Sequence, residues 1–213
     1  MNHPPRDQTR RYDVGKRAID IVASLVGLLL TAPLQAVIAV LVARALGRPV
    51  LFRQQRPGRD GKPFVLFKFR TMREPDEARD LITDLQRLTP LGARLRSASL
   101  DELPTLWNVL RGDMSLVGPR PLLMRYLDRY TPDQTRRHHV RPGITGLAQV
   151  SGRNALTWEQ KFAADLEYVR RRNFALDLRI LALTIRAVLR RDGISADGEA
   201  TMSEFLGSTG AST

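Results

Sequence analysis

The 213-residue chain contains no cysteine, which excludes disulfide bonds, thiolate nucleophiles and cysteine-ligated metal sites. It has only three histidines, which argues against a structural zinc site. Aromatic residues make up 6% of the chain, fewer than a stacking surface for nucleic acid requires. The sequence also lacks a Walker loop, a Rossmann glycine fingerprint and a Gly-x-Ser-x-Gly elbow, so the common nucleotide-binding and hydrolase sites are not indicated.

The chain is instead rich in basic residues, and its net charge of +12 is unevenly distributed. Residues 44–73 carry nine Lys or Arg and one Asp, a local charge of +8, whereas residues 18–43 carry only Asp20. A basic excess beside an apolar segment fits an anionic membrane surface or a phosphate-rich ligand, and nucleic acid is the rival on charge alone. Of the 34 basic residues, 30 are Arg, which binds phosphate through paired hydrogen bonds.

Residues 21–43 form an apolar segment that contains only three polar side chains. A straight helix of this length would reach about 35 Å, enough to cross a hydrocarbon core of about 30 Å. Pro33 lies near its middle, and both flanks are basic, which favours keeping both ends on the cytoplasmic side. We therefore predict a re-entrant membrane helix over residues 14–48 that breaks at Pro33, where Thr31 can hydrogen-bond a carbonyl freed by the proline.

Other interpretations of this segment stay open. A kinked helix that spans the membrane satisfies the length, and a helix buried in a protein core satisfies the hydrophobicity. A signal peptide is disfavoured because the apolar stretch is too long and strong positive charge follows it.

The rest of the chain predicts a mainly helical α+β fold with one β-hairpin. The hairpin strands are residues 50–53 and 64–69, which flank a Gly/Pro turn. Rigid turns are expected at 118–121 and 141–146. Helices are expected at 75–87, 89–96, 101–111, 157–172 and 176–191. The helix over 101–111 should bury a stripe formed by Leu103, Leu106, Trp107 and Leu110. The last helix has both apolar and basic residues, so a core-facing and a membrane-interfacial position are both open.

Adjacent carboxylates at the start of the helix predicted over 101–111 are the candidate catalytic residues. The helix dipole favours the ionised forms of Asp101 and Glu102, which could bind a hard divalent cation or attack phosphorus. The alternative for Asp101 is a simple N-cap. Five basic residues in constrained settings complete the set of groups expected for phosphoryl transfer, although each alone fits a solvated surface charge: Lys68, Arg70, Arg96, Arg120 and Arg141.

Six ordered motifs carry a resemblance to a known family. They are KRAID (16–20), QRPG (55–58), KFRTM (68–72), SLDELP (99–104), GDMSLVGPRP (112–121) and RPGITG (141–146). On these motifs the chain resembles the bacterial sugar-phosphate transferases that initiate surface-glycan assembly, the monotopic phosphoglycosyl transferases, over about residues 16–193. It departs from the family at Ala32-Pro33, often Ser-Pro, and within 146–154, where relatives have Trp and Asn in place of Leu147 and Ser151. It also lacks the extra N-terminal membrane helices of the longer relatives.

The resemblance implies a monotopic enzyme on the cytoplasmic face of the bacterial inner membrane. Such an enzyme moves a sugar-1-phosphate from a UDP-sugar to undecaprenyl phosphate and releases UMP. The resemblance further implies that Asp101 is the nucleophile of a covalent phosphosugar intermediate, that Glu102 assists it, and that magnesium is required, with Asp101 as its expected ligand. Lys68, Arg96 and Arg120 match the family's basic residues near the phosphates.

The expected organisation is a loose polar tail (1–13), the membrane helix (14–48), a catalytic domain (49–193) and a loose C-terminal tail (194–213). Expected partners are the two substrates and membrane lipids, without nucleic acid, and a homodimer stays open. The rival hypothesis is a membrane-tethered basic module that binds anionic lipid or nucleic acid without catalysis.

Overall fold

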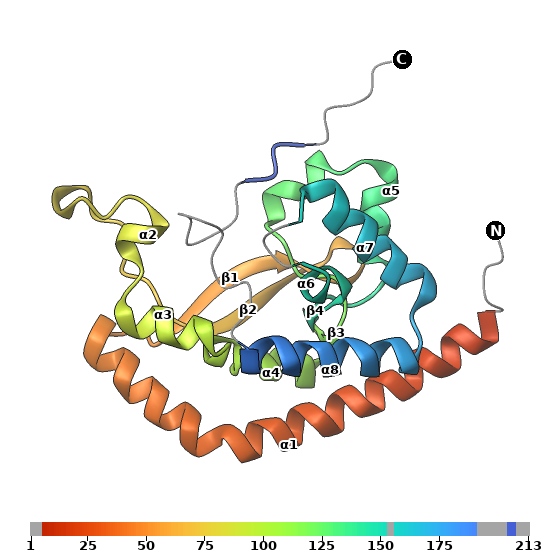
Figure 1. The fold of residues 1–213 in the computed structure, drawn as a ribbon, viewed down its shortest axis with the longest axis horizontal. Coiled ribbons are helices and arrows are strands. Elements are labelled where there is room, and N and C mark those ends of the chain that lie inside the picture. Colours follow the sequence, from red (N-terminus) through yellow and green to blue (C-terminus); the bar gives the residue numbers. More distant parts are fainter. Residues whose placement is uncertain (1–5, 153–155, 191–203, 208–213) are drawn as a thin grey trace.

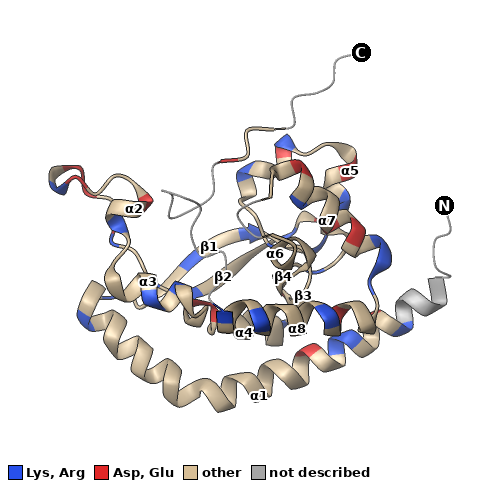
Figure 2. Ribbon diagram, in the orientation of Figure 1, with Lys and Arg blue, Asp and Glu red and all other residues tan. Residues whose placement is uncertain are grey.

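The computed structural model describes residues 6–152, 156–190 and 204–207, with side chains from residue 11 onward. Its first element, α1 (Arg6–Leu46), is a 41-residue helix that runs as a bowed rod along one side of the domain, with both ends turned toward it (Figure 1). Figure 2 shows that charged residues gather toward the ends of α1 and leave a long uncharged stretch between them. The expectation of a loose tail over residues 1–13 is therefore wrong from Arg6 onward.

The helix remains continuous through Pro33 instead of breaking into two legs. A proline removes one backbone hydrogen bond, and the turns on either side can still hold the helix. Thr31 Oγ1 donates to Gly27 O at 2.6 Å and accepts from Gln35 Nε2 at 2.9 Å. Gly27 O is not the carbonyl that Pro33 frees, which belongs to Leu29 four residues earlier, so the predicted role of Thr31 is not what the structure shows.

Residues 11–46 of α1 are the one segment among the described residues that is long and apolar enough to cross a membrane. Its most apolar window has a mean hydropathy of 2.4, and only 11% of that window is buried. A core helix would have most of this surface covered, so the buried-core interpretation is disfavoured.

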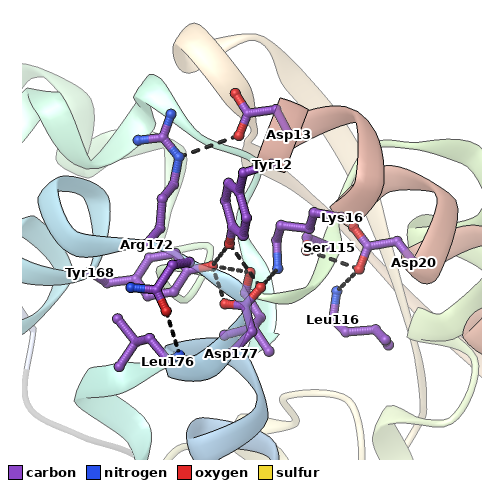
Figure 3. Close-up of polar contacts among 12 residues, drawn as sticks. Tyr12, Asp13, Lys16, Asp20, Ser115, Leu116, Tyr168, Arg172, Leu176 and Asp177 are labelled. Carbon is purple, nitrogen blue, oxygen red and sulfur yellow. Dashed lines mark hydrogen bonds and ion pairs between the residues drawn. The ribbon is translucent and has the colours of Figure 1, made fainter. Parts of the chain in front are cut away.

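Polar contacts in the first part of α1 attach the helix to the domain. Tyr12 Oη donates to Asp177 Oδ2 at 2.8 Å, and Lys16 Nζ donates to the same oxygen at 2.6 Å (Figure 3). One turn further, Asp20 Oδ1 accepts from Leu116 N at 3.0 Å and from Ser115 Oγ at 3.1 Å. These buried hydrogen bonds fix α1 to the folded domain at its polar end.

The predicted hairpin is confirmed. Strands β1 (Leu51–Pro57) and β2 (Pro63–Phe69) pair antiparallel, with Leu51 opposite Phe69, and a single turn η1 (Arg59–Gly61) joins them. A second sheet was not predicted, because β3 (Ser115–Val117) and β4 (Gly143–Thr145) are only three residues each and pair in parallel. The expected turn over 141–146 is thus partly a strand, packed so closely on 118–121 that a Cβ on Gly143 would lie 2.1 Å from Gly118 N.

Short helices and turns surround the sheets. Their bounds are η2 (Glu77–Arg79), α2 (Asp84–Arg87), α3 (Pro90–Ser97), η3 (Leu100–Glu102), α4 (Thr105–Arg111), η4 (Met124–Arg129), α5 (Pro132–Thr135), η5 (Arg136–His139), α6 (Leu147–Val150), α7 (Trp158–Arg171) and α8 (Phe174–Arg190). The predicted helices over 89–96, 157–172 and 176–191 are confirmed as α3, α7 and α8.

Three sequence predictions need correction. The helix expected over 75–87 is instead a bent arm that ends in α2, because Asp76 and Leu81 exchange two backbone hydrogen bonds and turn the chain back on itself. The helix over 101–111 is divided into η3 and α4, and Trp107 is 49% exposed while Asn108 and Val109 are buried. Within the expected C-terminal tail, residues 204–207 are described and Phe205 among them is buried; residues 194–203 and 208–213 lie outside the described ones.

Asn108 ties α4 to the outer edge of β2. Its Oδ1 accepts from Phe67 N at 3.1 Å, and its Nδ2 donates to Val65 O at 2.7 Å. These backbone groups face away from β1, so a side chain takes the place of a third strand.

Replacing Asn108 with Ala should lower the free energy of unfolding by about 2 kcal/mol or more, because two buried backbone groups lose their partners. Thermal or urea unfolding of the purified protein measures the change. Arg111→Ala, at an exposed position of the same helix, is the control and should shift stability by less than about 0.5 kcal/mol. Equal stability of the Asn108 and Arg111 variants would contradict this account.

Candidate active site

The acidic pair lies in the single turn η3, between α3 and α4. Ser99, just before it, has φ 55°, a left-handed conformation that turns the chain sharply after α3. Helix α4 begins only at Thr105, and no side chain caps either η3 or α4. The N-cap interpretation of Asp101 is therefore wrong, and so is the argument that an α-helix dipole ionises the pair, since no α-helix starts there.

Glu102 is held between two cations. Its Oε1 accepts from Lys68 Nζ at 2.5 Å and from Arg120 Nη2 at 3.1 Å. Lys68 comes from β2 and Arg120 from the 118–121 turn, so three separate segments meet at one carboxylate. Burial alone would raise the pKa of Glu102, but the charges of Lys68 and Arg120 outweigh it and lower this pKa to about 2.

Asp101 is in a different electrostatic environment. Burial and then the neighbouring charge of Glu102 raise the pKa of Asp101, although Lys68, Arg96 and Arg120 act in the opposite direction. Among the described residues, none donates a hydrogen bond to the Asp101 carboxylate. The two carboxylates are thus differentiated: Glu102 is a fixed anion, and Asp101 is a buried carboxylate that the protein has not paired.

Arg96 adds a third cation from α3. The helix starts as predicted, with Thr89 as its N-cap and Pro90 in its first turn. Arg96 Nε donates to Thr71 Oγ1 at 3.1 Å, which directs the side chain along the KFRTM motif. Burial lowers the pKa of Arg96, and the charge of Asp101 is the next largest influence and raises it. Of the predicted site residues, the structure therefore brings together Asp101, Glu102, Lys68, Arg96 and Arg120.

The other two predicted cations have different partners. Strand β2 ends at Phe69, so Arg70 lies just beyond it. Arg70 donates to the carbonyl oxygens of Pro49 and Leu46 and thereby holds the C-terminal end of α1. Arg141 Nε donates to Gly112 O at 2.8 Å, at the end of α4. Both residues fix backbone segments, and neither contacts the acidic pair.

The sequence did not predict the residues that hydrogen-bond the backbone of the turn that carries Arg120. Arg137 Nη2 donates to Arg120 O at 2.8 Å and to Asp165 Oδ2 at 2.6 Å, and this ion pair is buried. Arg56 Nη1 donates to Pro121 O at 3.4 Å. Arg56 lies in the QRPG motif, whose spacing alone indicates no role for it, whereas Arg137 lies in a basic run that carries no local signal of burial.

The site offers few protein ligands for a metal ion. Within the described ranges, no group of three or more His, Asp or Glu side chains could hold one. Glu102 is already engaged by two cations, so Asp101 is the one carboxylate of the pair available as a ligand. Magnesium commonly takes one or two carboxylates and completes its coordination with substrate phosphates and water, and Asp101 fits that pattern.

An acidic pair among three cations, close to a helix of membrane-spanning length, is the arrangement expected of a membrane-associated enzyme that acts on phosphate groups. The chain belongs to the bacterial sugar transferase family, whose sequence model matches residues 11–191.

Named relatives agree with this assignment. The chain is 51% identical over 194 residues to a protein of Bacillus subtilis described as the uncharacterized sugar transferase EpsL, covering 91% of this chain and 96% of that protein. It is 43% identical over 192 residues to a UDP-glucose:undecaprenyl-phosphate glucose-1-phosphate transferase of Caulobacter vibrioides (84% and 72%). It is 40% identical over 196 residues to the undecaprenyl-phosphate galactose phosphotransferase of Salmonella typhimurium (84% and 41%).

The low pKa of Glu102 predicts a specific acid sensitivity. The folded pKa is about 2 and the unperturbed value is 4.5, so the ion pairs stabilise the fold fully above about pH 4.5 and are lost as the pH falls toward 2. Glu102→Gln should therefore be less stable than the natural protein near pH 7 and lose less stability between about pH 5 and pH 3.

Thermal unfolding at several pH values measures this difference. Glu167→Gln, at an exposed pair with Arg171, is the control and should keep the acid sensitivity of the natural protein. If Glu102→Gln loses as much stability in acid as the natural protein, the ion pairs are not the source of the effect.

Proposed function

We propose that this protein transfers a sugar-1-phosphate from a UDP-sugar to undecaprenyl phosphate, releases UMP, and thereby starts a bacterial surface glycan. The observation that carries the proposal is the differentiated acidic pair: Glu102 is held by Lys68 and Arg120, and no described residue donates a hydrogen bond to Asp101 beside it. A family relationship to proteins named for this reaction supports it. The names of those relatives give glucose and galactose, so the two corresponding donors are the first to test.

The cations suit an anionic donor. A UDP-sugar carries two phosphates, and Arg96 and Arg120 can each bind phosphate oxygens through a planar pair of N–H groups. The side chain of Arg120 is half-exposed, so it can reach a substrate while one of its N–H groups still contacts Glu102. Lys68 is more buried, and its main role is to hold Glu102 in place.

Asp101 is the proposed nucleophile. A carboxylate oxygen of Asp101 attacks the phosphorus that carries the sugar, and the bond from this phosphorus to the bridging oxygen breaks, so that UMP leaves with the electron pair. The result is an acyl phosphate, a mixed anhydride between the Asp101 carboxylate and the sugar phosphate. A phosphate oxygen of undecaprenyl phosphate then attacks the same phosphorus, the bond to the Asp101 oxygen breaks, and the free carboxylate is restored.

Glu102 takes no part in bond formation in this mechanism. Its ion pairs fix Arg120 and Lys68 close to the reacting phosphate, and its negative charge raises the pKa of Asp101. Magnesium, with Asp101 and the donor phosphates as its ligands, would neutralise phosphate charge that otherwise repels an anionic nucleophile.

We further propose that the protein is monotopic: α1, continuous through Pro33 but bowed, enters and leaves the membrane on the same side, with both its ends on the cytoplasmic face (Figure 1). Polar anchors at residues 12–20 and a basic stretch after Leu46 place charged groups at both ends of α1 (Figure 2). Helix α8 supports a position at the membrane surface. Its exposed side carries an apolar stripe of Phe174, Leu178, Ile185 and Leu189, flanked by Arg179, Arg186 and Arg190.

A burst experiment tests the covalent mechanism. The purified protein, incubated with UDP-glucose or UDP-galactose and magnesium but without lipid acceptor, should release about one UMP per active site. Mass spectrometry should find a phosphosugar adduct on the peptide that contains Asp101. Asp101→Asn should give neither, with a loss of turnover of at least about 10³-fold, because an amide is a poor nucleophile.

Asp133→Asn, at an exposed position, is the matched control and should behave as the natural protein does. Release of UMP only after undecaprenyl phosphate is added, without an adduct, would mean that the lipid attacks directly and that the pair serves only as metal ligands. No UMP release from any UDP-sugar, together with tight binding of anionic vesicles, would favour the non-catalytic membrane module.

Single cysteines test the topology, since the chain has none of its own. Cysteines at Asp13 and Arg59 lie on either side of the apolar segment. Both should resist an impermeant thiol reagent in intact spheroplasts and react after permeabilisation, because both flanks stay in the cytoplasm. Labelling of one position but not the other in intact spheroplasts would mean that α1 crosses the membrane.

A further inference from the structure

Residues 204–206, here called the C-terminal anchor, contact the domain, and Phe205 among them occupies an aromatic pocket. Phe205 is only 1% exposed, although it lies in a stretch whose composition predicted a loose tail. Its ring contacts four others, at centroid distances of 5.6 Å to Tyr126, 5.9 Å to Tyr130, 5.4 Å to Trp158 and 5.0 Å to Phe162. Phe205 thus links η4 with α7, two elements that no strand pairing connects.

Polar contacts fix the direction and register of the anchor. Phe205 N donates to Tyr126 Oη at 3.2 Å, and Arg129 Nη1 donates to Phe205 O at 2.5 Å. Glu204 contacts Arg125 at 2.9 Å and Arg129 at 2.7 Å. Leu206 is 81% exposed. Both backbone polar groups of Phe205 are therefore satisfied by side chains of η4, which a nonspecific apolar contact would not provide.

Two rings of the aromatic pocket also contact the Arg137 side chain. The Arg137 guanidinium lies 5.8 Å from the ring centroids of Tyr130 and of Phe162, both of which contact Phe205. The same guanidinium donates to Arg120 O at 2.8 Å. A continuous set of contacts therefore runs from Phe205 through two aromatic rings to Arg137, and from there to the backbone of the residue that reaches Glu102.

We propose that Phe205 is a positioning residue for Arg120. With Phe205 in place the aromatic pocket is complete, Arg137 is confined between its rings and Asp165, and the 118–121 turn is held where Arg120 can bind a substrate phosphate. Without it, water enters the pocket, Arg137 gains freedom, and the turn loses its support. This inference rests on the proposed function only in giving Arg120 a phosphate to bind.

The full-length protein allows a matched comparison within the anchor. Phe205→Ala removes the ring, Phe205→Leu keeps apolar volume, and Leu206→Ala alters a neighbouring exposed side chain. With UDP-sugar titrated under steady-state conditions, Phe205→Ala should raise the KM for the donor on the order of tenfold, because a small displacement of a binding group is costly. Phe205→Leu should recover most of the loss, and Leu206→Ala should stay within about twofold of the natural protein.

A double-mutant cycle separates positioning from general stability. If Phe205 acts through Arg120, its replacement should have little further effect on the KM for the donor in an Arg120→Lys background, where paired phosphate binding is already lost. Additive effects of Phe205→Ala and Arg120→Lys would overturn the proposal. An unchanged KM in Phe205→Ala with only a lower melting temperature would also overturn it, since the anchor would then be purely structural.

Hydrogen exchange gives a readout that does not depend on activity. Phe205→Ala should accelerate amide exchange in the peptides that contain Arg120 and Arg137, and Leu206→Ala should not. Unchanged exchange at both sites would overturn the proposal whatever the kinetics. If the natural protein turned over no UDP-sugar while the exchange effect was present, the proposed function would fail and the structural link from Phe205 to Arg120 would stand.

Discussion

The contact of Glu102 with Lys68 and Arg120 is the interaction on which the site depends. It joins three segments that share no secondary structure: η3, β2 and the turn over 118–121. Two cations satisfy the charge of Glu102, whereas no described residue donates a hydrogen bond to the carboxylate of the neighbouring Asp101. Removing Lys68 or Arg120 would leave the negative charge of Glu102 only partly neutralised. The acidic pair, the two cations and the three segments that carry them therefore form one unit.

The attachment of α1 extends this unit toward the membrane. Asp20, near the polar end of the helix, binds Leu116 N and Ser115 Oγ, two residues before the turn that carries Arg120. At the other end, Arg70 donates to the carbonyl of Leu46, the last residue of the helix, and to that of Pro49 just beyond it. Arg70 follows directly on the strand that carries Lys68. Both cations that hold Glu102 are therefore connected through short backbone segments to opposite ends of the apolar helix, so its bowed shape and the geometry of the site are linked.

Local chemistry made much of the fold predictable. The Gly/Pro turn between two apolar runs specified the hairpin, and Thr89-Pro90 and the capping box at Thr157 specified where α3 and α7 begin. Prediction failed where backbone pairing within a loop, or a contact with a distant segment, decided the outcome. Backbone pairing of Asp76 with Leu81 prevented a helix over 75–87. In α4, the buried face contains Asn108 instead of Trp107, because the Asn108 side chain hydrogen-bonds the free backbone groups at the edge of β2.

The sequence by itself determined that an apolar segment with basic flanks precedes a domain containing an acidic pair and several constrained cations, because composition, spacing and motifs are local properties. Only the tertiary structure decided which cations serve the pair: Lys68 and Arg120 bind Glu102, and the charge of Arg96 acts on Asp101. Arg70 and Arg141 instead bind backbone carbonyls. It also brought Arg137 to the backbone of Arg120, and Phe205 to the two rings that contact Arg137. Burial and charge pairing depend on which distant segments pack together, and no local pattern in the chain records that.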